Sequence, residues 1–67
     1  MTNKQQKIID IASELFSKNG YEETSTRLIA NKAGVSEGLI FRHFNNKDGL
    51  LNVLLNIGQQ KIEKSIN

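Results

Sequence analysis

The sequence predicts an all-α fold in which three helices pack as a bundle and a long fourth helix begins beside them. Apolar residues recur at three- and four-residue spacing in four successive segments, which is the period of one face of an α-helix. The segment Ala33-Gly34-Val35-Ser36 separates two of these patterns and has the composition of a tight turn. The chain has 67 residues, which is enough for one small domain with a single core.

Composition narrows the class of protein. Cysteine is absent, which excludes disulfides and thiolate metal sites. No apolar stretch is long enough to cross a membrane, and the first residues lack the apolar core of a signal peptide. We therefore expect a soluble, cytoplasmic protein without a membrane partner.

The net charge of +2 is unevenly distributed along the chain. Residues 1–25 carry three lysines against four acidic residues, which gives −1, whereas residues 26–47 carry four basic residues against one acidic residue, which gives +3. Residues 48–67 are balanced, so the positive excess lies wholly in the middle stretch. Such an asymmetry is weak evidence for a polyanionic partner, and solvated surface charge explains it as well.

Residues 4–19 are predicted to form an amphipathic helix, started by Thr2 or Asn3 as N-cap and ended by Gly20. Its apolar face consists of Ile8, Ile9, Ile11, Ala12, Leu15 and Phe16. No polar constellation suited to chemistry lies on it, so this helix is predicted to be scaffold. The ring of Tyr21 is expected to fold back onto it with the hydroxyl at the surface.

A second, shorter helix is predicted over residues 26–33. Ser25 and Thr26 both have the hydroxyl that an N-cap needs, so either residue can start it. Gly34 supplies the left-handed conformation that ends a helix. The face turned to the core consists of Ile29, Ala30 and Ala33.

The third predicted helix covers residues 37–44, with Ser36 as its N-cap and with Ile40 and Phe44 on its buried face. Two helices joined by a turn of three to four residues that contains glycine form the helix-turn-helix motif. In this motif the second helix enters the major groove of DNA.

The opposite face of this helix carries Leu39, Phe41 and Arg42. We expect Leu39 and Phe41 to be exposed, where an apolar side chain can touch a thymine methyl group. Gly38 has two interpretations: it gives clearance for the close approach of a backbone, that of DNA included, or it is tolerated because it lies near a helix end.

Asn45 and Asn46 are expected to end the third helix and to cap a fourth over residues 47–65. This helix is too apolar for three short helices to cover, so residues 55–66 should extend past the core. The exposed apolar stripe is expected to consist of Leu54, Leu55, Ile57 and Ile62. The core is predicted to contain Phe16, Ile29, Ile40 and Phe44, joined by Leu15, Val35 and Leu51.

These residues together resemble the N-terminal DNA-binding domain of tetracycline-repressor-like (TetR-family) transcriptional regulators. The resemblance covers residues 8–55 without gaps and is carried by Ile8-Ile9-Asp10-Ile11-Ala12, Leu15-Phe16, Gly20-Tyr21, Thr24-Ser25-Thr26-Arg27, Ile29-Ala30, Ala33-Gly34-Val35-Ser36, Gly38, Phe41-Arg42-His43-Phe44, Lys47 and Leu50-Leu51. It implies a homodimeric repressor that binds a palindromic operator in double-stranded DNA. It also implies that a larger domain, for ligand binding and dimerisation, is absent from this chain, which by itself should bind no inducer.

By position, the resemblance places DNA contacts on the helix-turn-helix. The base contacts would be Arg27, Glu37, Gly38, Leu39 and Arg42, and the phosphate contacts Thr26, Ser36, Phe41, His43 and Lys47. Thr26 and Ser36 would also cap their helices. The family most often has tyrosine, with a phosphate-binding hydroxyl, where this chain has Phe41, so the role of Phe41 is reduced to packing on sugar or backbone.

Two of these residues carry a charge that is unfavourable at its position unless a partner compensates it. Glu37 would repel phosphates and suits the groove only if it accepts from a cytosine amino group or points along the groove. Lys47 is a cation at a helix start, which the helix dipole disfavours, and an external anion there would compensate it. His43 is the only histidine, so we expect a phosphate contact or a surface polar residue rather than a metal site.

Other functions are weighed against DNA binding. No nucleophile–base pair, paired carboxylates or phosphate-binding loop is visible, so neither an enzyme nor a cofactor is expected. The alternative is a helical protein-interaction module that docks through residues 47–65. Steep salt dependence of binding separates the two, because phosphate contacts release counterions.

Overall fold

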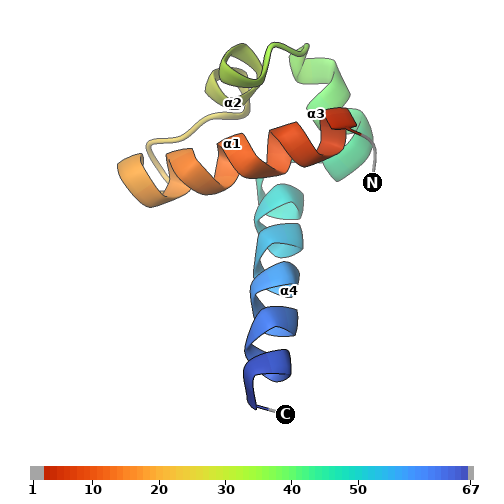
Figure 1. The fold of residues 1–67 in the computed structure, drawn as a ribbon. Helices are drawn as coiled ribbons and strands as arrows, with labels where there is room; N and C mark the ends of the chain where they lie inside the picture. The colour runs from red at the N-terminus through yellow and green to blue at the C-terminus, as the bar shows by residue number, and fades with distance from the viewer. Residues whose placement is uncertain (1–2, 67) are drawn as a thin grey trace.

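The computed structural model describes residues 3–66, with side chains described for residues 3–57. It contains the helices α1 (Asn3–Asn19), α2 (Thr26–Ala33), α3 (Glu37–Phe44) and α4 (Lys47–Ile66). The predicted all-α fold is confirmed, and residues 3–66 contain no strand. Figure 1 shows α2 and α3 on one side of α1, and α4 extending away from the other three helices.

One buried hydroxyl holds the link between α1 and α2. Gly20 ends α1 with a φ of +89°, and its N–H donates to the Phe16 carbonyl at 3.0 Å. The fully buried hydroxyl of Thr24 donates to the carbonyl oxygens of Gly20 at 2.9 Å and of Leu15 at 3.2 Å. The link is therefore fastened to the last turn of α1 without leaving a buried polar group unpaired.

Ser25, rather than Thr26, is the N-cap of α2. The Ser25 backbone is extended, and its side chain accepts from the N–H three residues further on at 3.0 Å. Thr26 is already the first helical residue, so the capping role that the resemblance implied for it is wrong. At the other end Gly34 has a φ of +72°, and the Val35 N–H donates to the Ala30 carbonyl at 3.0 Å, which is the Schellman pattern.

A tight turn around Asn45 directs the chain from α3 into α4. Asn45 has a φ of 72° and a ψ of −56°, the only positive φ outside glycine in the described part of the chain. The Asn46 N–H donates to the Phe44 carbonyl at 2.9 Å, which closes a three-residue γ-turn. The Asn46 side chain accepts from the Gly49 N–H at 2.8 Å and so caps α4, as predicted.

The core lies where α1, α2, α3 and the start of α4 meet. Its buried members are Ile8, Ile9, Ala12, Leu15, Ile29, Ala30, Ala33, Ile40, Phe44 and Leu50. Phe16 and Val35, predicted as core residues, are only partly buried against this cluster. Among the residues of α4 whose side chains are described, Leu50 is fully buried, whereas the predicted Leu51 is half-buried. Neighbouring positions on a helix point about 100° apart, so the rotation of α4 selects between the two leucines.

Gly49 allows α4 to begin against the end of α3. A Cβ atom at Gly49 would overlap the carbonyl oxygen of Phe44 and would lie 3.1 Å from its carbonyl carbon. The two backbones therefore meet where no side chain fits. The sequence places Gly49 in the first turn of the fourth helix but does not indicate this contact.

The start of α4 is covered better than the sequence predicts. Leu55 is 54% exposed, as expected, but Leu54 and Ile57 pack partly against the core. The expected apolar stripe is therefore interrupted, and Ile62, its fourth member, lies outside the residues whose side chains are described. None of the helices in the described part of the chain has the length and apolar character needed to cross a membrane.

Candidate nucleic-acid interface

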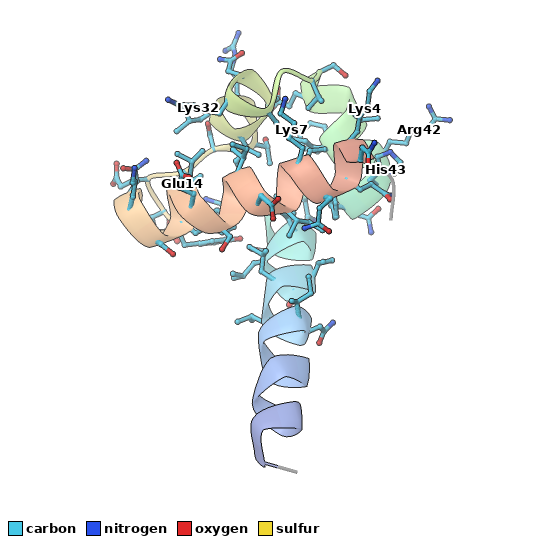
Figure 2. The ribbon with its side chains drawn as sticks, viewed as in Figure 1. Lys4, Lys7, Glu14, Lys32, Arg42 and His43 are labelled. Atoms are coloured by element: carbon cyan, nitrogen blue, oxygen red, sulfur yellow. The ribbon has the colours of Figure 1, made fainter. Side chains whose placement is uncertain are left out.

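The outward face of α3 carries three of the residues predicted to contact DNA. Arg42 is exposed, and Figure 2 shows its side chain pointing away from the bundle. Phe41 is 44% exposed, as predicted, whereas Leu39 is only partly exposed because it packs against the core. The buried face of α3 is wider than the stripe of Ile40 and Phe44, because α3 packs against both α2 and α4.

Gly38 lies on the same exposed face, at the start of α3. A Cβ atom added there would meet only the Ser36 Oγ, at 3.9 Å, which is an ordinary contact. The packing of this chain therefore does not require the missing side chain. If clearance is the reason for glycine at this position, the approaching group belongs to a partner.

Ser36 caps α3 and keeps a hydrogen available for an outside acceptor. Its Oγ accepts from the Leu39 N–H at 3.2 Å, which confirms the predicted cap. Because the cap uses the oxygen as an acceptor, the hydroxyl hydrogen can still be donated to a phosphate oxygen. Arg27 is exposed in the first turn of α2 and, like Arg42, has no polar partner within the described residues.

Thr26 and Glu37 bind each other across the start of the two helices. The Thr26 hydroxyl donates to the Glu37 Oε2 at 2.7 Å, in a partly buried position. This bond joins the first residue of α2 to the first residue of α3. While it persists, Thr26 cannot donate to a phosphate, and its hydroxyl offers only acceptor capacity. Glu37, whose carboxylate would repel phosphates, thus has a hydrogen-bond partner inside the protein.

His43 is held by α1 in a defined orientation. The Gln5 Nε2 lies 2.9 Å from the His43 Nδ1, so the contact joins the first turn of α1 to the last turn of α3. An amide nitrogen only donates, so Nδ1 accepts, and in the neutral ring the hydrogen resides on Nε2. The exposed His43 can then donate from Nε2 to an external oxygen.

Lys47 is engaged by the link between α1 and α2. Its Nζ lies 4.2 Å from the centroid of the Tyr21 ring and donates to the Tyr21 carbonyl at 2.9 Å. The Tyr21 hydroxyl donates in turn to Asp48, and the ring packs on Phe16 with centroids 5.2 Å apart. The cation at the start of α4 is therefore compensated within the protein, so its presence no longer requires an external anion.

The predicted contact residues differ in how firmly the protein holds them. Thr26, Glu37, His43 and Lys47 have polar partners inside the chain. The sequence did not indicate Gln5, whose partner lies 38 residues away, because no local pattern reports so distant a contact. In the part of the chain that the structure describes, no group of His, Asp and Glu side chains is arranged to hold a metal ion.

Comparison with known proteins places this arrangement in a family. Residues 8–54 match the family model of bacterial regulatory proteins, tetR family. The chain is 54% identical over 54 residues to the uncharacterized HTH-type transcriptional regulator YvkB of Bacillus subtilis, covering 81% of this chain and 28% of that protein. It is 41% identical over 59 residues to the HTH-type transcriptional regulator QacR of Staphylococcus aureus, covering 88% of this chain and 31% of QacR.

A third relative is the fatty acid metabolism regulator protein of Bacillus subtilis, 42% identical over 48 residues, with 72% of this chain and 25% of that protein covered. The chain thus spans less than a third of the length of these relatives. The family model nevertheless matches more than half of the chain and includes α2, the turn and α3. The chain therefore belongs to the tetR family of bacterial regulatory proteins, as the resemblance of its sequence predicted.

Proposed function

We propose that this chain binds double-stranded DNA in a sequence-specific manner and so regulates transcription. The observation that carries the proposal is the exposed face of α3, where Arg42 points away from the bundle with no polar partner in the described residues. In a helix-turn-helix this face enters the major groove. The relatives QacR and YvkB, both HTH-type transcriptional regulators by name, support the same function.

Within this proposal, α3 and the first turn of α2 supply the base contacts, and residues on or beside the helix-turn-helix bind the phosphates that flank those bases. Base contacts are proposed for Arg27, Glu37, Gly38, Leu39 and Arg42, and phosphate contacts for Thr26, Ser36, Phe41, His43 and Lys47. The intramolecular bond between Thr26 and Glu37 means that both must exchange partners, or that Thr26 accepts rather than donates, when DNA binds. Leu39 offers a thymine methyl group only the exposed part of its side chain.

The longer regulator is proposed to be a homodimeric repressor on a palindromic operator. The relatives are more than three times as long as the part that this chain matches, which leaves room for a dimerisation and ligand-binding domain. Two tethered domains gain effective concentration at the second half-site, so a single domain should bind a half-site more weakly.

Selection of binding sites from a random duplex library tests the proposal. We expect enrichment of one short sequence, and binding to that sequence that weakens steeply as salt rises. A pool without enrichment and with shallow salt dependence would instead favour the alternative, a helical module that docks on another protein through α4. Leu55 is an exposed apolar residue that such docking would use.

Arg42→Ala should weaken binding to the selected sequence by about 1–3 kcal/mol and relax the preference at one base pair. The reason is that a guanidinium can donate to guanine O6 and N7 together, and a methyl group cannot. Affinity measured across single-base variants of the selected sequence checks this. Lys18→Ala is the control, because Lys18 is exposed at the other end of α1, 3.9 Å from Glu14. An equal loss on every sequence would make Arg42 a phosphate contact.

Lys47→Met should weaken binding to specific and random duplexes alike and lower the salt slope by about one. Methionine keeps an apolar stem over the Tyr21 ring but removes the ammonium group, which is the atom that a phosphate would bind. Thermal unfolding of the variant shows how much the lost contact with Tyr21 matters for stability. A variant with an unchanged slope and a lower midpoint of unfolding would assign Lys47 a structural role only.

A further inference from the structure

We propose that Lys4 and Lys7, in the first two turns of α1, form a second phosphate-binding surface that extends the DNA interface beyond the helix-turn-helix. This inference rests on the proposed function, because it concerns the DNA that flanks the bases read by α3. We call the surface formed by these two lysines the α1 flank.

The fold brings the α1 flank next to the end of α3. The 2.9 Å contact between Gln5 and His43 joins the residue that follows Lys4 to the residue that follows Arg42. Figure 2 shows Lys4 on the same side of the molecule as Arg42 and His43, and Lys7 one turn further along α1. The α1 flank is thus continuous with the surface proposed to meet DNA.

Both lysines are free to bind an external anion. Lys4 and Lys7 are exposed, and neither has a hydrogen bond or an ion pair within the described residues. They stand three residues apart on a helix, so both project from one face. The nearest acidic residue along α1, Asp10, accepts from Gln6 at 3.0 Å instead.

The two ends of α1 differ in charge. The ion pair of α1, between Lys18 and Glu14, lies at the far end, together with the acidic residues that follow the helix. The first turn contains no acidic residue. The sum of −1 over residues 1–25 therefore hides a positive end beside α3 and a negative end away from it. A positive strip that continues from Arg42 past His43 to the lysines of α1 complements the regular row of phosphates on duplex DNA better than it complements an isolated anion.

The double variant Lys4→Gln/Lys7→Gln tests the inference against the control Lys18→Gln. We measure affinity over a series of salt concentrations on two duplexes that share the selected sequence, one with long flanks and one trimmed to the bases that α3 reads. The unsubstituted protein should prefer the long duplex. The double variant should lose this preference, and its salt slope on the long duplex should fall by about 1.8, because each phosphate contact contributes about 0.9.

Over a fourfold change in salt, that loss makes the affinity of the double variant vary about tenfold less than that of the unsubstituted protein. Its ranking of single-base variants should stay unchanged, since phosphate contacts carry no sequence information. A double variant that keeps the slope and the preference for long flanks would overturn the inference, as would a Lys18→Gln control that changes equally. Absence of DNA binding by the unsubstituted protein would overturn the proposed function itself, which is a distinct result.

Discussion

Phe44→Ala should destabilise the domain by about 3–5 kcal/mol, the range for removing a buried phenylalanine side chain. Phe44 is 7% exposed and belongs to the core cluster with Ile29, Ile40 and Leu50. It also ends α3, and its carbonyl closes the turn around Asn45. For a chain of 67 residues the total free energy of unfolding is expected to be about 3–10 kcal/mol, so the variant should be largely or wholly unfolded.

Phe41→Ala is the matched control for this prediction. It makes the same chemical change three residues earlier on the same helix, but Phe41 is 44% exposed and lies outside the buried cluster. Its effect on the free energy of unfolding should be much smaller. Denaturant unfolding followed by circular dichroism measures both variants. A Phe44→Ala variant that unfolds cooperatively with near-original stability would show that Phe44 does not contribute to the core as its burial indicates.

Gly49→Ala should also destabilise the domain, although helix propensity alone predicts the opposite. Alanine stabilises a helix by about 1 kcal/mol relative to glycine. At Gly49, however, the added Cβ would overlap the Phe44 carbonyl oxygen, and a backbone atom cannot swing aside as a flexible side chain can. We expect the start of α4 to shift and the net cost to be about 1–3 kcal/mol, the range for overpacking.

The control for this prediction is Gly38→Ala. Both glycines lie in the first turn of a helix, but a Cβ at Gly38 would meet nothing closer than the Ser36 Oγ at 3.9 Å. The free energy of unfolding of the Gly38→Ala variant should therefore be unchanged or raised by up to about 1 kcal/mol. Thermal unfolding of the two variants tests the prediction: the unfolding midpoint should fall for Gly49→Ala and should not fall for Gly38→Ala. A stabilised Gly49→Ala variant would mean that the chain tolerates a wider separation between α3 and α4.

The proposed interface combines free side chains with side chains that the protein already orients. Arg27 and Arg42 have no polar partner in the described residues, so the bases that they are proposed to contact would have to order them. His43 and Lys47 are held by Gln5 and Tyr21. A side chain that is already held in place loses less conformational freedom on binding, so under the proposed function these contacts would lower the entropic cost of docking on the DNA backbone.

The sequence by itself determined the turns and most of the helix ends. Ser36, Gly34 and Asn46 act through hydrogen bonds to residues no more than five positions away, so their composition and order were sufficient to predict caps and turns. The ordered set of motif residues also sufficed to identify the family. The choice between Ser25 and Thr26 as N-cap was left open because both hydroxyls can serve, and a shift of one residue changes which of them lies outside the helix.

Only the tertiary structure decided how the helices are rotated and which distant residues meet. The sequence predicted Leu51 as the core residue of the fourth helix, whereas the crossing of α4 over the end of α3 buries Leu50 instead. Because α4 begins so close to the end of α3, position 49 has room for glycine but not for a residue with a Cβ atom. The contact between Gln5 and His43 placed the lysines of α1 beside α3, which a count of charge along the chain could not show. Each of these outcomes depends on contacts between different segments of the chain, and no local pattern contains that information.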